Sequence, residues 1–180
     1  MKTRLIFPLS GLCLILLALF SACNSSPATT AENLAPNPSF ETAQSGWQGN
    51  GPMTFTRSED MAHSGKQSVC ISNLPPQSSG DWVTSKFISV TPGTTHTFNT
   101  YAKGDFDHEV SITVFPIDAN GNYMEGSATD ISFNNTDWTY AEVALKVPPD
   151  AAAVELDLGT NNASDTTTTG TICYDDVSFR

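Results

Sequence analysis

The chain has 180 residues, with 8 basic and 19 acidic side chains and a formal net charge of −11 at pH 7. This length fits one compact domain with a short extension. So acidic a chain repels nucleic acids and anionic lipid headgroups, and we therefore expect neither as a partner.

Residues 1–22 predict an export signal. Met1–Arg4 carry two positive charges, and an almost unbroken apolar run of 16 residues extends from Leu5 to Phe20. Small residues then precede Cys23, as in bacterial lipoprotein signal peptides. We expect cleavage before Cys23 and lipidation of its sulfur, which would anchor the protein in the bacterial cell envelope, at the outer membrane or cell surface. The alternative is a transmembrane helix, which normally needs about 20 apolar residues.

Residues 23–33 are rich in Ser, Pro, Thr and Ala, a composition typical of flexible linkers. We expect this segment to be a tether that begins at the lipidated Cys23. The folded domain is then expected to occupy residues 34–180.

Residues 34–180 predict strands, because no stretch keeps the apolar spacing of an amphipathic helix and short alternating runs occur instead. Turn residues such as Pro92-Gly93 and Pro148-Pro149 separate these runs. Their regular spacing predicts an all-β fold, an antiparallel β-sandwich. The strands are expected at residues 53–57, 67–72, 81–90, 94–102, 109–115, 129–133, 138–147, 152–158 and 171–179.

The cysteines indicate a disulfide. Once the signal peptide is removed and Cys23 is lipidated, Cys70 and Cys173 remain. An even pair in an exported protein usually forms a bond; two buried free thiols are the alternative. Strict alternation places Cys70 on the opposite face from Val69 and Ile71, so we expect the bond outside the core or beside a bulge.

The two ends of the predicted domain carry related motifs. Acidic oxygen donors stand next to apolar residues in Asn37-Pro38-Ser39-Phe40-Glu41 and again in Tyr174-Asp175-Asp176-Val177-Ser178-Phe179. Such a combination suits first and last strands that are clipped together around a hard cation. We therefore expect the two ends to meet.

Five motifs in a fixed order resemble the signatures of cellulose- and xylan-binding modules of families 4, 9 and 22. The resemblance extends over nearly all of residues 34–180. It implies a jelly-roll, galactose-binding-like sandwich and an extracellular polysaccharide of the β-glucan or xylan type as ligand. The motifs are Asn37–Glu41, Ser45-Gly46-Trp47, His63–Val69, Pro92–Phe98 and Asp175–Phe179.

The resemblance also implies a structural Ca²⁺ site near the meeting ends. Its ligands would be a carbonyl oxygen of Ser39, Glu41, a carbonyl near Lys66, and Asp175. The alternative is that Glu41 and Asp175 are ordinary surface or turn carboxylates. By strand parity, Asp176 is expected to point away from Asp175.

A sugar-binding groove needs exposed aromatic rings beside polar side chains, and the resemblance places it on an open face of the sandwich. Trp82 and Phe115 could instead pack in the core. The residues that alternation predicts to point outward, and that we expect to form one groove, are Asn99, Tyr101, Phe115, Glu155 and Asp157, with Trp82 entering a further strand.

The combined expectation is a monomeric, membrane-anchored module that binds polysaccharide without cleaving it. Two other functions remain compatible with the sequence. The same sandwich could contact protein partners, or it could be a glycoside hydrolase or polysaccharide lyase, although a sandwich face offers only a shallow pocket for catalysis.

Overall fold

The computed structural model describes residues 31–42, 46–50, 54–74, 81–105, 108–161 and 170–180. The predicted signal peptide, Cys23 and the tether up to residue 30 lie outside these residues. Within them, no helix has the length and apolar character needed to span a membrane.

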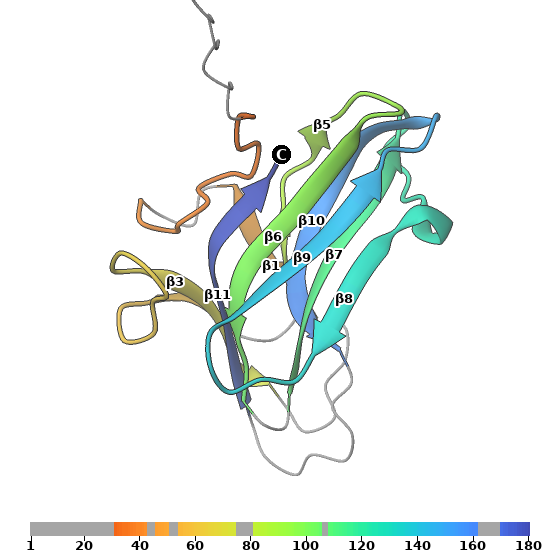
Figure 1. Ribbon diagram of the computed structural model, residues 1–180. Helices are drawn as coiled ribbons and strands as arrows, with labels where there is room; N and C mark the ends of the chain where they lie inside the picture. The colour runs from red at the N-terminus through yellow and green to blue at the C-terminus, as the bar shows by residue number, and fades with distance from the viewer. Residues whose placement is uncertain (1–30, 43–45, 51–53, 75–80, 106–107, 162–169) are drawn as a thin grey trace, which may run out of the picture. The chain divides into compact units, whose positions relative to one another are not determined.

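The described residues form two sheets in which every pairing is antiparallel (Figure 1). Sheet A has the order β1-β4-β10-β7-β8, with β5 also pairing with β10, and sheet B has the order β2-β3-β11-β6-β9. Sheet A contains β1 (Trp47–Asn50), β4 (Asp81–Ser85), β5 (Ile88–Ser89), β7 (Glu109–Asp118), β8 (Thr129–Phe133) and β10 (Ala151–Asn161). Sheet B contains β2 (Thr54–Ser58), β3 (Ser68–Leu74), β6 (Thr95–Lys103), β9 (Thr139–Lys146) and β11 (Gly170–Phe179). One short 3-10 helix, η1 (Glu125–Ser127), precedes β8.

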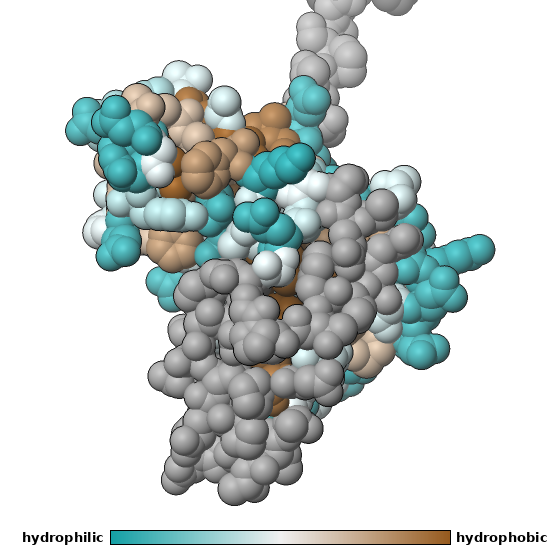
Figure 2. Space-filling model, turned by 180° about the vertical axis from the view of Figure 1, so that it is seen from behind, coloured by the Kyte–Doolittle hydropathy of each residue, from teal (hydrophilic) through white to brown (hydrophobic). Residues whose placement is uncertain are grey.

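The core lies between the sheets and is built by alternation, because successive side chains of a strand point to opposite faces. In β9, Ala141, Val143 and Leu145 are buried and their neighbours are exposed. Strands β7 and β10 contribute core residues in the same way. The view from behind shows hydrophobic residues at the surface among hydrophilic ones (Figure 2).

The predicted antiparallel sandwich is confirmed, with two differences in its strands. Trp47–Asn50 forms the short strand β1, which was not predicted. The single strand expected at residues 81–90 is interrupted at Lys86 and Phe87, so it becomes β4 and β5. Both strands still pair with β10, and the interruption therefore leaves the sheet order unchanged.

The two ends of the domain meet, as the motifs predicted. The amide of Leu34 donates to the carbonyl of Phe179 at 2.8 Å, and the amide of Val177 donates to the carbonyl of Pro38 at 2.7 Å. The side chain of Asn33 also bonds to the main chain of Val177 and of Phe179. Asn33, which was assigned to the tether, therefore belongs to the domain.

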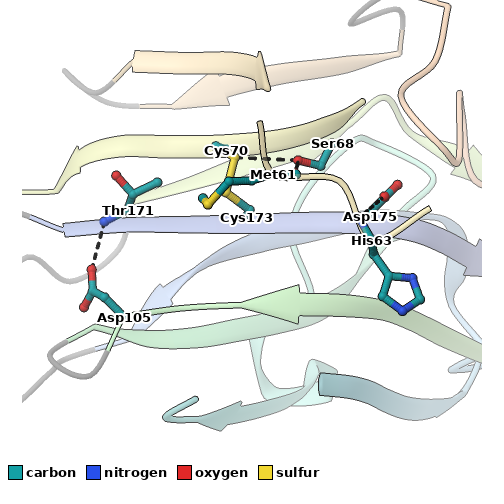
Figure 3. Close-up of a disulfide and its surroundings, with 8 residues drawn as sticks. All are labelled: Met61, His63, Ser68, Cys70, Asp105, Thr171, Cys173 and Asp175. Atoms are coloured by element: carbon teal, nitrogen blue, oxygen red, sulfur yellow. Dashed lines mark hydrogen bonds between the residues drawn. A yellow bond between two sulfur atoms is a disulfide. The ribbon is translucent and has the colours of Figure 1, made fainter. Parts of the chain in front are cut away.

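Cys70 and Cys173 form the predicted disulfide, which joins directly paired residues of β3 and β11 across a sequence separation of 103 (Figure 3). The Cys70 sulfur lies 3.7 Å from the hydroxyl oxygen of Ser68, whose own hydroxyl donates to the carbonyl of Met61. The bond is thus outside the apolar core but still buried, because the segment before β3 lies against it.

Tyr174 ties the two sheets together through the core. This residue of β11 is fully buried, and its hydroxyl accepts a hydrogen bond from the amide of Ser111 at 3.1 Å. The same hydroxyl oxygen contacts the carbonyls of Ser111 in β7 and Gly159 in β10. A residue of sheet B therefore fixes the spacing of two central strands of sheet A.

Removal of the disulfide should lower stability strongly. The bond closes a loop of roughly 100 residues, and losing a native disulfide typically costs about 2–5 kcal/mol. In urea unfolding, a Cys70→Ala/Cys173→Ala double variant should unfold at lower denaturant than the oxidised protein. Reductant should lower the urea midpoint of the wild type to the same extent and leave that of the double variant unchanged. A wild-type midpoint that reductant does not change would refute the role of the bond.

Candidate functional site

A groove of about 290 Å³ lies on the outer face of sheet A. Its floor comes from β7 and β10, and one wall comes from Ala128 and from Asp130 of β8. The described lining residues are Ser111, Thr113, Phe115, Ala128, Asp130, Asp157, Gly159 and Thr160.

Strand alternation places the groove side chains opposite the core. Val114 and Leu156 are fully buried between the sheets, so their neighbours in sequence face outward. Antiparallel register then sets Asp157 beside Thr113 and Glu155 beside Phe115. Phe115 therefore lies in the groove and outside the core cluster, which settles the alternative in which it packed inside.

Three aromatic rings lie together at this face. Tyr123 contacts Phe115 edge to face, with ring centroids 5.9 Å apart, and contacts Phe87 in the same way at 6.4 Å. Phe87 and Tyr123 are 51% and 50% exposed, so their rings are available to a ligand. The hydroxyl of Tyr123 donates to Glu155 at 2.8 Å, and this bond fixes the orientation of the ring.

Phe87, Tyr123 and Asp130 were not among the predicted site residues. A signal for Tyr123 existed, because the turn at residues 120–122 returns the chain along the end of β7. The amide of Met124 donates to the carbonyl of Pro116, and this pairing sets Tyr123 beside Phe115. Phe87 lies in the interruption between β4 and β5, where no periodic pattern applies.

The carboxyl group of Asp157 is buried and its pKa is raised. The residue is only 5% exposed, and its Oδ1 atom is buried without a hydrogen-bond partner. Burial, and then the charge of Glu155, raise the pKa of the Asp157 carboxyl to about 8. The pKa of Glu155 is also raised by burial, against the effect of the Tyr123 hydrogen bond. Asp157 is therefore largely protonated at neutral pH and able to donate a hydrogen bond.

The expectation that all the candidate sugar ligands share one groove is wrong. Asn99 and Tyr101 belong to β6 in sheet B, whereas Phe115, Glu155 and Asp157 belong to sheet A. Alternation correctly placed all five residues outside the apolar core. It carries no information on the sheet to which each strand belongs, and the two groups therefore lie on opposite outer faces.

Tyr101 belongs instead to an aromatic cluster on sheet B. Its ring stacks on His63, with centroids 3.6 Å apart, and contacts Tyr140 edge to face at 5.5 Å. His63 in turn contacts Trp138 edge on at 5.6 Å. Asn99 pairs with Glu142 on the same sheet.

Trp82, the remaining aromatic candidate, lies in β4. Its main chain pairs with Gly159, which lines the groove. The side chain of Trp82 lies outside the part of the chain that the structure describes.

The residues of the predicted cation site converge on the turn at residues 63–67. Asp175 accepts the amide of His63 at 2.8 Å (Figure 3). It also accepts the amide of Ser64 at 3.0 Å. Glu41 accepts the amides of Lys66 and Gln67 at 2.7 and 2.8 Å. The two carboxylates from opposite ends of the domain are thus held at one short turn.

Gly65 makes room for the Glu41 carboxylate. Its φ is +62°, and a Cβ atom built there would lie 2.3 Å from Glu41 Oε1. Ser39 lies two residues before Glu41 in the same segment. This cradle offers hard oxygen donors of the kind that Ca²⁺ prefers, so the residues present suit the ion.

Asp176 does not point away from the site, contrary to the parity prediction. Its carboxylate bonds to the ring of His63 at 2.7 Å and accepts the hydroxyl of Ser64 at 2.7 Å. Asp176 has a φ of +52°, and the register of β11 shifts between Asp175 and Ser178. This irregularity breaks the alternation, so both aspartates face the same turn.

The family profile described as "Carbohydrate binding domain" matches residues 32–166. The chain belongs to this family of carbohydrate-binding domains. Comparison with curated protein sequences gives no match.

Several solved structures of similar fold are themselves carbohydrate-binding modules. This carbohydrate-binding domain is 22% identical to "Family 16 Carbohydrate Binding Module-2", with a TM-score of 0.61 over 82% of this chain and 99% of that one. It is 17% identical to the "CBM22-1 xylan-binding domain from Paenibacillus barcinonensis Xyn10C", with a TM-score of 0.59 over 79% and 90% of the two chains. It is 14% identical to TmCBM61 in complex with β-1,4-galactotriose, with a TM-score of 0.57 over 83% and 99%. At these identities the likeness establishes the fold.

The stability of the domain should fall as the pH rises from about 4 to 8. Folding raises the pKa of Asp157 from 3.8 to about 8, so the folded state binds more protons than the unfolded state over this range. The free energy of unfolding therefore falls as the pH rises. Asp157→Asn should make the decline in unfolding free energy shallower in urea titrations at pH 4, 6 and 8.

The control is Asp118→Asn. Hydrogen bonds from Asn122 lower the pKa of Asp118, so its contribution to stability is lost only as the pH falls below the usual carboxyl range. The decline in unfolding free energy between pH 4 and 8 should persist in this variant. An equally steep decline in Asp157→Asn would contradict the raised pKa of Asp157.

Proposed function

We propose that the groove on sheet A binds a polysaccharide chain of the extracellular β-glucan or xylan type and does not cleave it. Membership of the carbohydrate-binding domain family supports sugar binding. One protein of similar fold is a xylan-binding domain, and another was solved in complex with β-1,4-galactotriose. The groove itself supplies both elements that a sugar ring needs, aromatic faces and hydrogen-bonding side chains.

The observation that carries the proposal is the position of Tyr123. Its ring is half exposed between Phe115 and Phe87, and Glu155 holds its hydroxyl. A ring held in this way loses little conformational freedom when the apolar face of a sugar packs against it. Asp157 and Thr113, at the adjacent floor of the groove, are placed to bond the sugar hydroxyls.

The arrangement of the carboxyl groups supports binding rather than hydrolysis. A glycosidase uses two carboxyl groups that flank the scissile bond, one as acid and the other as base or nucleophile. Glu155 and Asp157 project from the same strand on the same face, and burial raises the pKa of both. They would contact the same side of a sugar chain. The third carboxyl of the groove, Asp130, lies on β8 beside Thr113 and is exposed.

We further propose that the lipoprotein signal in residues 1–22 and the lipid on Cys23 hold a monomeric domain in the bacterial cell envelope. The domain would bind polysaccharide at the outer membrane or cell surface. Two or more acyl chains give stable anchoring where one gives only marginal binding. The acidic character of the chain supports attachment through lipid rather than through anionic headgroups.

Replacement of Tyr123 tests the groove. Tyr123→Ala removes the central ring, and the affinity for a bound β-glucan, xylan or mannan should fall at least tenfold, which corresponds to about 1.4 kcal/mol. Affinity gels followed by titration calorimetry would measure the loss. Retardation by no polymer in the panel would reject the proposed function.

Tyr140→Ala is the matched control. Tyr140 is 49% exposed on sheet B, and its hydroxyl donates to Glu142, just as that of Tyr123 donates to Glu155. Its loss should leave the affinity unchanged. If Tyr140→Ala weakened binding as much as Tyr123→Ala, the ligand would occupy the other face.

We also propose that the cradle at residues 63–67 holds a structural Ca²⁺ ion through Glu41, Asp175 and carbonyl oxygens of Ser39 and Lys66. The ion would neutralise the two buried or partly buried carboxylates and fasten the two ends of the domain. Extracellular modules bind Ca²⁺ with dissociation constants of about 10⁻⁴ to 10⁻³ M.

Calcium should therefore stabilise the domain. At a concentration 100 times the dissociation constant, the gain in unfolding free energy should be about 2.7 kcal/mol. Thermal unfolding with calcium and with chelator would measure it. Glu41→Gln should weaken the effect and Glu142→Gln, on the face of sheet B, should preserve it; identical melting with calcium and chelator would exclude the site.

A further inference from the structure

The groove is lined by carboxyl groups without a basic counterpart among its described lining residues. Asp130 and Asp157 line it, and Glu155 lies two residues from Asp157 on the same face of β10. None of the described lining residues is lysine, arginine or histidine. A neutral sugar would offer these carboxyl groups no cationic partner.

The surroundings of Asp157 indicate which kind of ligand would suit the groove. This residue lines the groove and is only 5% exposed. Its Oδ1 atom has no hydrogen-bond partner. A buried carboxyl oxygen without a partner is costly unless a ligand supplies a donor. The residue therefore provides an unfilled acceptor at the floor of the groove.

We propose that the groove selects its polysaccharide by charge and that Asp157 binds a protonated amino group of a sugar, as found in a chitosan-type polymer. This inference rests on the proposed sugar-binding function of the groove. A sugar hydroxyl could bond to Asp157 Oδ1, but only an ammonium group would also favour the ionised form of the carboxyl. A uronate polymer would place an anion beside Asp157 and Glu155, which opposes the ionisation of both, and is disfavoured.

The aromatic rings suit the same ligand. An ammonium group close to the face of a tyrosine or phenylalanine ring is attracted by the ring quadrupole. Tyr123 and Phe115 stand beside the two acidic residues of β10, so one amino sugar could pack against a ring and approach Asp157.

Binding of an ammonium group should release a proton. Before binding, burial and Glu155 keep Asp157 largely protonated below about pH 8. Asp130 on β8, Tyr123 after β7 and Glu109 on β7 also face this side of sheet A, and none of them is a cation that could already stabilise an ionised Asp157. An ammonium group beside the carboxyl favours its ionised form, and the proton passes to the solvent.

Titration calorimetry with four oligosaccharides of equal length tests the proposal. The ligands are a deacetylated glucosamine oligomer, its fully N-acetylated counterpart, a cello-oligosaccharide and an oligogalacturonate, each at pH 6 in salt of about 0.15 M, where surface charges are screened beyond about 8 Å. The deacetylated oligomer should bind at least tenfold more tightly than its acetylated counterpart, and the uronate should bind most weakly. In buffers of different ionisation enthalpy, only the deacetylated oligomer should release a proton.

Two variants that each replace one carboxyl group by an amide separate the groove from the acidic surface. Asp157→Asn should reduce the ratio of affinities for the deacetylated and acetylated oligomers towards one and abolish proton release. Glu142→Gln removes a carboxyl group from sheet B and should preserve both. Equal ratios in the two variants would show attraction to the whole surface and overturn the proposal.

The outcomes also separate this inference from the proposed function. Equal binding of neutral and amino oligomers by the wild type would refute charge selection and leave sugar binding intact. Binding of none of the four would refute charge selection, and retardation by the β-glucan, xylan and mannan polymers would then decide the proposed function separately. Asp130→Asn, at an exposed position of the groove wall, is a second variant that should lower the ratio if Asp157→Asn fails to fold, and an unchanged ratio there would count against the proposal.

Discussion

The whole domain depends on the position of β11, the last strand, between β3 and β6 in the middle of sheet B. The disulfide joins it to β3 at Cys70, and the N-terminal segment bonds to its end at Leu34. Its residue Tyr174 crosses the core to sheet A. Because a central strand completes the hydrogen bonding of both neighbours, sheet B forms only when the C-terminal residues are in place.

The same strand positions the groove. Tyr174 bonds to the main chain of Ser111 and Gly159, a directly paired couple in β7 and β10. These two strands present Phe115 and Asp157 on their other face. A carboxyl group that lacks a partner in a buried position costs free energy, and the disulfide and the tie between the sheets stabilise the strands that hold it. The disulfide and the joined chain ends are thus in sheet B, and the groove that we propose to bind sugar is on sheet A.

Most of the strands could be predicted because alternation is a local property of the chain. The side chains of β6 and β9 divide between core and surface as their sequence patterns indicated. Errors arose where local structure departs from alternation, at the interruption near Phe87 and at the irregular Asp176 with its φ of +52°. A period of two assigns a face to each residue but no sheet, which is why Asn99 and Tyr101 were grouped with Asp157.

The sequence by itself determined the sandwich, the cysteine pair, the meeting of the two ends and the type of residues available to bind a sugar. These follow from periodicity, from composition and from motifs at the chain ends. Only the tertiary structure decided which outward residues share a face, that Tyr123 stands between Phe115 and Phe87, and that Asp157 is buried beside Glu155. The reason is physical: burial and contact depend on strands far apart in the chain, and the order in which strands pair is not encoded in any one of them.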